Sequence, residues 1–371
     1  MLHKINVSYS LLIAVGSLAL GCASARVGTK PTDALPANAL QPLGRTLRNG
    51  SQQLELISSA AHVGFQFEGR ECQVFATLPG GQGHNYLQYE LDGVYQQRLR
   101  VEGNSTAPLT ITAPTAGRHT VWIYKATEAH TGPIALQKIT ALRIKSLPPP
   151  AGPLIEFIGN SITCGAAADA SEVPCGTGEY HDQHNAYQAY GPRVARALYA
   201  NFLLSSVSGI GVYRTWNAPG PSMPQVYERV DFQAKNPQRW DFATYKPAVV
   251  SIALGTNDLS TGDGKIPRLP FDSATFVNDY AQFVQLVKTK YPQARIALLS
   301  SPMLNGKTRT TLQNCLAVVK AKTDTAYPSE PPVALFFFEP MQPRGCSGHP
   351  SVQDHALLAQ QLEPFFKKLL L

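Results

Sequence analysis

The stretch LIEFIGNSIT, residues 154–163, decides the fold class of the second half of the chain. Its first six residues form an apolar run with the length of a buried strand, and a polar loop with a serine follows at once. Four similar runs come later, at residues 201–205, 248–254, 294–300 and 333–338. Three stretches carry apolar residues at helical intervals, namely residues 185–199, 276–290 and 351–371. This alternation predicts a three-layer α/β domain with a parallel sheet covered on both faces.

The region before this domain has a different rhythm of short strands and turns. Residues 85–91 (NYLQYEL) alternate apolar and polar side chains, and Asp92-Gly93 then predicts a hairpin turn into residues 94–101. Residues 119–125 (HTVWIYK) predict another strand. Strands at such spacing, without helical periodicity, predict an antiparallel β-sandwich. The stretch SLPPPAGP, residues 146–153, predicts a stiff connector between the two domains.

These patterns divide the 371-residue chain into five segments. They are a signal peptide over 1–25, a tether over 26–43, a β-sandwich domain over 44–147, a proline-rich linker over 148–153 and an α/β domain over 154–371. A content of 44% hydrophobic and 15% charged residues excludes a disordered chain. The net charge of +7 permits nucleic-acid binding, but lysines and arginines are scattered singly, so nucleic acid is not an expected partner.

The N-terminus has the pattern of an export signal. The apolar run from Leu11 to Leu20 follows a short positive region and is too short to span a bilayer, which is typical of a signal peptide. Two cleavage sites compete after it. Residues 19–22 (ALGC) resemble a bacterial lipobox, in which Cys22 is acylated and attaches the protein to a membrane, whereas residues 23–25 (ASA) fit ordinary cleavage. The lipobox is favoured, and either site predicts a protein of the bacterial cell envelope or a secreted one.

Export makes disulfide bonds possible. Five cysteines follow Cys22, and this odd number leaves at least one thiol unpaired. Cys164 with Cys175 is the first candidate pair because the two are close in sequence, and Cys315 with Cys346 is the second. Burial of any one of them as a small hydrophobic residue is about as favoured.

Neither a metal nor an organic cofactor is expected. No C-x-x-C spacing occurs in the sequence. The stretch His181-Asp182-Gln183-His184 has a spacing that can bind metal, but no third ligand lies nearby in sequence.

Polar loops follow four of the predicted strands, at the edge where ligands bind in open parallel sheets. They are residues 159–163 (GNSIT), 208–211 (SGIG), 255–258 (GTND) and 345–350 (GCSGHP). Alone, Ser161 would be interpreted as a helix N-cap or turn residue. Gly209 lets a backbone N–H approach a ligand, and Asn257 offers an amide donor to negative charge. His349 stands where its imidazole can point across the sheet edge toward Ser161.

Together these loops supply a serine, a base that takes its proton and donors for an oxyanion, which nucleophilic catalysis requires. The four blocks resemble those of the SGNH or GDSL-type hydrolases. The resemblance implies that Ser161 is the nucleophile and His349 the base. It also implies an oxyanion hole made of the backbone N–H groups of Ser161 and Gly209 and the Asn257 side chain. A G-x-S-x-G elbow is absent, so the ordinary α/β-hydrolases fit poorly.

The first half of the chain narrows the resemblance. The sandwich domain of carbohydrate esterase family 2 is similar to two stretches here, residues 117–121 (GRHTV) and 125–129 (KATEA). Other parts of that family are similar to residues 208–213 and 345–350. The resemblance covers nearly the whole mature chain. It implies a jelly-roll sandwich joined to an SGNH domain, and a serine esterase that removes acetyl groups from plant polysaccharides such as xylan and glucomannan without a cofactor.

The chain departs from the family pattern at three places. Asn160 stands where many SGNH enzymes have aspartate. Cys346 replaces the aspartate three residues before the histidine. Family 2 members work with a Ser-His dyad in which a backbone carbonyl fixes the imidazole, so the resemblance implies that mechanism here. Gly348 stands where the family often has an aromatic that stacks on sugar. Trp216 and Tyr213 are the candidate sugar contacts, with Trp216 the better of the two.

Two other functions stay open on the sequence. One is an SGNH lipase or thioesterase acting on acyl chains longer than acetyl, against which a pocket lined by small polar groups would count. The other is a surface glycan-binding protein with an inactive second domain, which the missing aspartate near His349 favours. The presence of Ser161, Gly209, Asn257 and His349 argues against this second alternative, because any one of them is easily lost.

Overall fold

The computed structural model describes Met1 and residues 32–371, apart from residues 104 and 218. The predicted signal peptide and both cleavage sites around Cys22 lie outside the described residues. Part of the predicted tether is described, and it contains η1 (Ala37–Ala39) and β1 (Asp33–Pro36), which pairs antiparallel with β9 (Ile134–Leu147). The sandwich therefore begins before residue 44. Within the described part of the chain, no helix combines the length and apolar character needed to cross a bilayer.

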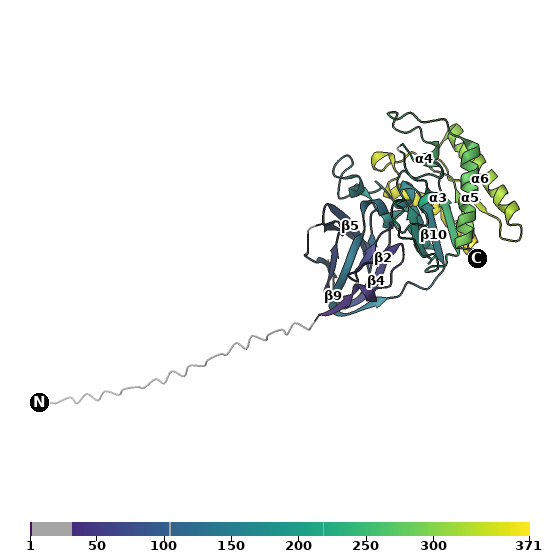
Figure 1. Ribbon diagram of the computed structural model, residues 1–371. Coiled ribbons are helices and arrows are strands. Elements are labelled where there is room, and N and C mark those ends of the chain that lie inside the picture. Colours follow the sequence, from purple (N-terminus) through teal and green to yellow (C-terminus); the bar gives the residue numbers. More distant parts are fainter. Residues whose placement is uncertain (2–31, 104, 218) are drawn as a thin grey trace. The chain divides into compact units, whose positions relative to one another are not determined.

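The described residues of the N-terminal domain form nine antiparallel strands, several of which are labelled in Figure 1. Besides β1 and β9 they are β2 (Thr46–Arg48), β3 (Leu54–Leu56), β4 (His62–Thr77), β5 (His84–Leu91), β6 (Val94–Glu102), β7 (Leu109–Thr112) and β8 (Arg118–Lys125). Asp92 and Gly93 both have positive φ in the tight turn between β5 and β6, as the sequence predicts. Register shifts between β4 and β9 bend these long strands around the core. The predicted antiparallel β-sandwich is confirmed.

The C-terminal domain has a parallel sheet of five strands in the order β11-β10-β12-β13-β14. The strands are β10 (Leu154–Gly159), β11 (Asn201–Ser206), β12 (Val249–Ala253), β13 (Arg295–Leu299) and β14 (Ala334–Phe336). All six residues of β10 are buried, as its apolar run predicts. The strand order reverses at β10, so the loops after β10, β11 and β12 meet at a topological switch point, where ligands of such sheets bind.

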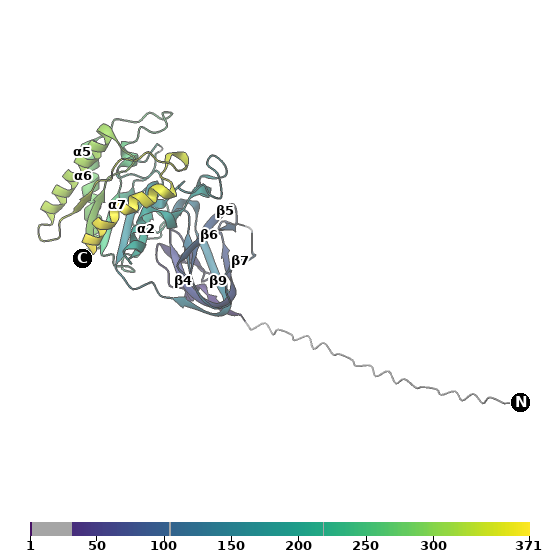
Figure 2. The same cartoon turned by 180° about the vertical axis from the view of Figure 1, so that it is seen from behind.

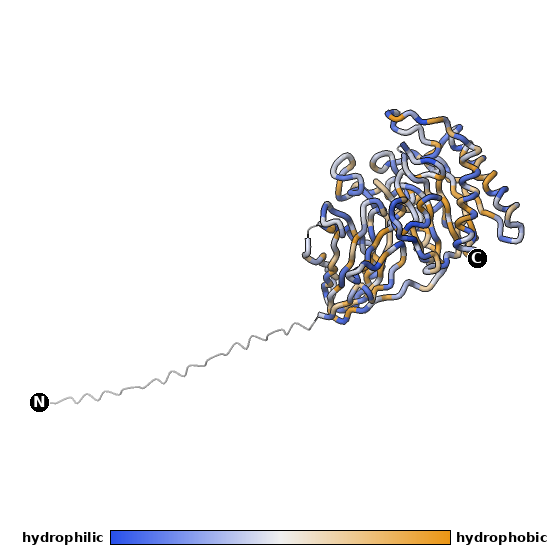
Figure 3. The backbone as a smooth tube through the Cα atoms, viewed as in Figure 1, coloured by the Kyte–Doolittle hydropathy of each residue, from blue (hydrophilic) through white to orange (hydrophobic). Residues whose placement is uncertain are grey.

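Helices cover both faces of this sheet, which confirms the predicted three-layer α/β architecture. Figure 1 shows α5 (Ser273–Lys290) beside α6 (Gly306–Ala326), and Figure 2 shows α2 (Tyr190–Ala197) beside α7 (Val352–Leu370). Short helical segments occupy the loops: α1 (Ser161–Cys164), α3 (Met223–Val226), α4 (Thr256–Leu259), η2 (Ala129–Thr131), η3 (Tyr180–Gln183), η4 (Ala186–Gln188) and η5 (Cys346–Gly348). Figure 3, which has the same view as Figure 1, shows hydrophobic residues along the strands of both domains.

Buried polar contacts join the two domains. The Arg45 guanidinium, 2% exposed, donates to the Tyr227 carbonyl at 2.7 Å and lies 3.9 Å from the Glu156 carboxylate in β10. On β5, the Gln88 amide donates to Asn185 Oδ1 at 2.5 Å. Loss of either partner would leave a buried polar group unsatisfied, so these contacts hold the sandwich against the loops that build the site.

Candidate active site

A pocket of about 690 Å³ opens at the carboxyl edge of the parallel sheet. The residues that the sequence predicts for catalysis all line it: Ser161, Gly209, Asn257 and His349. Trp216 lines the same pocket with 44% of its surface exposed, which is the position expected of a sugar contact. These residues come from four separate loops, and the parallel sheet brings the loops together.

Ser161 is the first residue of α1, and one residue, Asn160, separates it from β10. The N-cap is Asn160, whose side-chain oxygen accepts the Ile162 N–H at 3.0 Å. Ser161 is therefore not the N-cap, and its hydroxyl is not needed to complete the helix. Among the described residues, no group accepts a hydrogen bond from the Ser161 N–H, which is one of the orphan donors at a helix start.

The imidazole of His349 is oriented by a backbone carbonyl. His349 Nδ1 donates to the Ser347 carbonyl at 3.0 Å, so Nε2 carries the lone pair. Ser347 reaches this geometry in the left-handed region, with φ of 50°. Among the described residues, no carboxylate forms an ion pair with His349. This is the arrangement that the resemblance implies for a chain with Cys346 in place of aspartate.

The reacting side of His349 faces the pocket without a strong partner. Its Nε2 lies 3.5 Å from the Tyr180 hydroxyl, which is at the long limit of a hydrogen bond. In the described part of the chain, no hydrogen bond joins Nε2 to Ser161 Oγ. Catalytic hydrogen bonds of unliganded enzymes are often long and tighten when substrate binds.

The loops that follow β11 and β12 form one hydrogen-bonded unit. Asn257 Nδ2 donates to the Ile210 carbonyl at 2.7 Å, which leaves its other amide hydrogen for the pocket. Gly209 has φ of 75°, a conformation that glycine adopts freely. The Asp258 carboxylate accepts the N–H groups of Val212 and Tyr213 at 3.0 Å. This unit holds the Gly209 N–H and the Asn257 amide at the same pocket, as oxyanion donors require.

Known families match both halves of the chain. The carbohydrate esterase 2 N-terminal domain matches residues 43–150, and the GDSL-like lipase/acylhydrolase family matches residues 157–331. An acetylxylan esterase / glucomannan deacetylase of Cellvibrio japonicus is 30% identical over 294 residues, which are 77% of this chain and 79% of that protein. The chain belongs to carbohydrate esterase family 2. The resemblance stated from the sequence motifs is thus confirmed.

Two further similarities extend over most of this family 2 chain. A second acetylxylan esterase / glucomannan deacetylase of Cellvibrio japonicus is 26% identical over 337 residues, 89% of each chain. The structure of a family two carbohydrate esterase from Clostridium thermocellum in complex with cellohexaose is 27% identical, with a TM-score of 0.75, and the match covers 91% of this chain and 98% of that one. Both domains of the chain therefore follow the family architecture.

The loop that precedes His349 is held by a disulfide bond between Cys346 and Cys175, which are 171 residues apart. Both pairings predicted from the sequence are wrong. Cys164 lies in α1, buried with its Sγ 3.2 Å from Ser206 Oγ, and Cys315 is buried in α6. The residue that replaces the usual aspartate therefore fixes the loop before His349 through a covalent bond.

Tyr213 is not placed as a sugar contact. Its ring packs against Phe271 and Phe276 at 6.1 and 6.4 Å, and its hydroxyl accepts the Asp272 N–H at 3.2 Å. Tyr213 also does not line the 690 Å³ pocket. Trp216 remains the candidate sugar contact.

Glu128, on the sandwich side of the domain boundary, is a site residue that the sequence analysis missed. Its Oε2 accepts the N–H of Ser208, the neighbour of Gly209, at 2.6 Å, and its Oε1 lies 3.4 Å from His184 Nε2. Burial alone raises the pKa of Glu128, but hydrogen bonds and charge from His184 and the Ser208 N–H together lower that pKa to about 2. The carboxylate thus stays ionised and holds the loop that contains Ser208 and Gly209. The KATEA stretch contained this residue, but gave no sign of its role.

Replacing Glu128 by glutamine is expected to lower kcat by about 10- to 100-fold with little change in KM, because it displaces Gly209, the predicted oxyanion donor, and so weakens transition-state binding. The Glu128 charge also raises the pKa of His349. Glutamine removes this charge and so lowers that pKa, and the acid limb of the variant's pH profile should therefore move to lower pH. Steady-state kinetics with an acetyl ester, beside the control Glu102→Gln, whose pair with Arg100 is exposed, measures both effects. Kinetics and pH profile equal to those of the wild type would remove Glu128 from the site.

Replacing Asn257 by alanine is expected to lower kcat by about 10²- to 10³-fold, since one oxyanion donor is lost. KM should change little because the ground-state carbonyl uses this donor less than the transition state does. Acetate release under saturating substrate checks the effect. A loss below about tenfold would show that Asn257 does not bind the oxyanion.

The acid limb of kcat/KM is expected to have an apparent pKa below 6.5. Burial lowers the pKa of His349 from the ordinary 6.5, against the opposing effect of the Ser347 carbonyl. A base works in its neutral form, so activity should persist at mildly acidic pH and disappear only as the pH falls through that lowered pKa. The pH dependence of nitrophenyl acetate hydrolysis measures the limb. An acid limb centred above 6.5 would contradict this environment for His349.

Proposed function

We propose that this family 2 esterase removes O-acetyl groups from plant polysaccharides such as xylan or glucomannan, through an acetyl-enzyme on Ser161. The observation that carries the proposal is the convergence of Ser161, His349, Gly209 and Asn257 in one pocket. Relatives named acetylxylan esterase / glucomannan deacetylase, and a family structure in complex with cellohexaose, support a polysaccharide substrate.

In the proposed mechanism, His349 Nε2 takes the proton of Ser161 Oγ as this oxygen attacks the acetyl carbonyl. The N–H groups of Ser161 and Gly209 and the Asn257 amide stabilise the tetrahedral oxyanion. The C–O bond to the sugar then breaks, and the sugar alcohol leaves with the proton from the imidazolium. Water, deprotonated by His349, attacks the acetyl-enzyme and releases acetate and free Ser161.

The pocket walls are also compatible with a second substrate class. Ile162, Leu259, Met303 and Leu304 give the pocket an apolar side, whereas Ser208, Thr256, Ser260 and Thr261 give it a polar one. The apolar side favours a longer acyl chain as the alternative substrate of the same dyad. Chain-length preference therefore separates a carbohydrate deacetylase from a lipase or thioesterase.

Acetate release from acetylated xylan and acetylated glucomannan tests the proposal, with Ser161→Ala as the matched inactive variant. Nitrophenyl esters of acetate and of a long-chain acid are assayed alongside. We expect acetate release from at least one polysaccharide, lost in Ser161→Ala, and slower hydrolysis of the long-chain ester. Hydrolysis of the long-chain ester only would favour a lipase, and glycan binding without any hydrolysis would favour a glycan-binding protein.

We also propose that the protein is exported to the cell envelope or secreted. The Cys175–Cys346 disulfide fits an oxidising compartment, and the N-terminal sequence fits a signal peptide with Cys22 as the lipidated residue. Labelling with a fatty-acid analogue in a bacterial host tests the lipid anchor. Label on the wild type that is lost in Cys22→Ser would support it, and an unlabelled wild type would indicate ordinary cleavage.

A further inference from the structure

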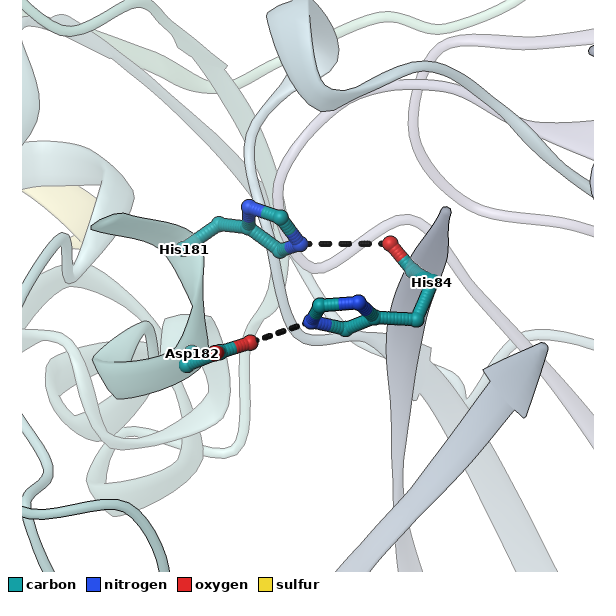
Figure 4. Close-up of side chains that lie close together, drawn as sticks. All are labelled: His84, His181 and Asp182. Carbon is teal, nitrogen blue, oxygen red and sulfur yellow. Dashed lines mark hydrogen bonds and ion pairs between the residues drawn. The ribbon is translucent and has the colours of Figure 1, made fainter. Parts of the chain in front are cut away.

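Two histidines and one aspartate meet at the boundary between the two domains, outside the catalytic pocket (Figure 4). His84 is the first residue of β5 in the sandwich, whereas His181 and Asp182 belong to η3 in the hydrolase domain. One ligand atom from each lies within 4.8 Å of the other two. We propose that His84, His181 and Asp182 bind a divalent transition metal ion, with Zn²⁺ as the first candidate.

The structure supplies the third ligand that the sequence lacked. His184, the sequence neighbour that forms a metal-like spacing with His181, points to Glu128 instead and is fully buried there. Its place is taken by His84, 97 residues away in the chain from His181. A short sequence motif cannot indicate His84 as a ligand, because His84 comes from the other domain.

The chemical types of the three donors fit zinc. Imidazole nitrogens and a carboxylate oxygen are the common ligands of Zn²⁺, at about 2.0–2.2 Å. A tetrahedral ion with such bonds places ligand atoms about 3.4 Å apart. His84 Nε2 and Asp182 Oδ1 are closer than this, at 2.5 Å, and the full set extends to 4.8 Å. Side-chain rotations would have to separate His84 from Asp182 for the ion to enter, and the proton between these two residues would be released to solvent when metal binds.

The surroundings provide access and support. His84 and His181 line an open pocket of about 380 Å³, through which an ion enters and a water completes the coordination. The other carboxylate oxygen of Asp182 accepts the Glu179 N–H at 2.8 Å, which orients this ligand. His181 Nε2 donates to the His84 carbonyl at 3.2 Å, a contact that links the two histidines and that His181 gives up if Nε2 binds the ion.

The charged groups around the cluster do not oppose a cation strongly. Arg98 donates to the Asp182 backbone carbonyl, and its charge is paired with Glu172 at 3.2 Å. Glu179 lines the same open pocket as the histidines and adds negative charge. A bound ion would link β5 to η3. The η3 segment also contains Tyr180, whose hydroxyl is the hydrogen-bond partner of His349 Nε2.

Titration of tag-free full chain with ZnCl₂, by calorimetry and native mass spectrometry, tests the proposal. The variants are His84→Asn and His181→Asn. The matched control is His119→Asn, because His119 forms an equivalent pair with Asp92, at 2.7 Å, but is not part of the three-residue cluster. We expect one Zn²⁺ per wild-type or control chain. Each cluster variant should bind more than about 100-fold more weakly, exceeding the loss that a supporting partner alone causes.

Thermal unfolding gives a second readout, since an ion that binds the folded chain raises the unfolding temperature and a chelator reverses the rise. This rise should occur in the wild type and in His119→Asn but not in the cluster variants.

Co²⁺ bound to the wild type should show the visible absorption of a four-coordinate site, a measurement that needs no variant. Absence of Zn²⁺ and Co²⁺ binding to the wild type would show an ion pair only, and equal binding by the cluster variants would place any metal elsewhere. Either result overturns the proposal.

Discussion

Replacing His349 by alanine is expected to lower kcat for acetate release by about 10⁴- to 10⁶-fold while the chain stays folded. His349 lines the pocket of Ser161, and its Nε2 carries the lone pair because Nδ1 donates to the Ser347 carbonyl. Without this base, the serine hydroxyl remains protonated and a weak nucleophile. The steady-state rate of acetate release, with circular dichroism to verify folding, measures the loss.

Tyr180→Phe is the matched control for this prediction. The Tyr180 hydroxyl lies 3.5 Å from His349 Nε2, so its removal changes the surroundings of the base without removing the base. A long contact of this kind contributes little, and we expect a change in kcat below about tenfold. A His349→Ala enzyme that kept more than about a tenth of the wild-type kcat would show that another group accepts the serine proton.

Removing the disulfide with the double variant Cys175→Ser and Cys346→Ser is expected to lower the free energy of unfolding by about 4–5 kcal/mol. The bond closes a loop of 171 residues, and long loops gain the most from closure in the chain-entropy description. Activity should fall as well, because Cys346 begins the η5 turn that brings the Ser347 carbonyl to His349.

Urea unfolding and acetate release, measured on the same preparations, test this prediction. Cys315→Ala is the control, since Cys315 is a buried free thiol in α6 outside the catalytic pocket. We expect the control to lose far less stability than the double variant. Stability within about 1 kcal/mol of the wild type, together with unchanged kcat, would mean that the loop holds its shape without the bond.

The architecture was largely predictable because burial determines the pattern of a parallel strand. All five apolar runs became the strands of the sheet, since strands covered on both faces must be apolar throughout. Helices were less visible. Helix α6 was not predicted, because its buried apolar residues are few among many threonines and lysines: Leu312, Cys315, Leu316 and Val319. The helix predicted over 185–199 is shorter, because Pro192 is accepted only in the first turn of α2, which starts at Tyr190.

The meeting of the candidate catalytic residues in one pocket was predictable for a topological reason. Ser161, Gly209 and Asn257 each follow the carboxyl end of a parallel strand, and these ends share one edge of the sheet. Contacts between distant segments were not predictable. The Cys175–Cys346 bond, the Glu128 contact with Ser208 and the approach of His84 to Asp182 all depend on how separate segments come together. The cysteine pairs predicted from the sequence were wrong because the bonded partners, Cys175 and Cys346, are distant in sequence.

Covalent labelling with a fluorophosphonate probe, followed by peptide mapping, tests most directly whether Ser161 is the nucleophile that His349 activates. Such probes react with activated serine hydroxyls, so the label reports both the position and the activation of the nucleophile. We predict one adduct, on Ser161, in the wild-type protein and a strongly reduced adduct in His349→Ala. An adduct on another residue, or acetate release that continues after Ser161 is fully labelled, would contradict the account.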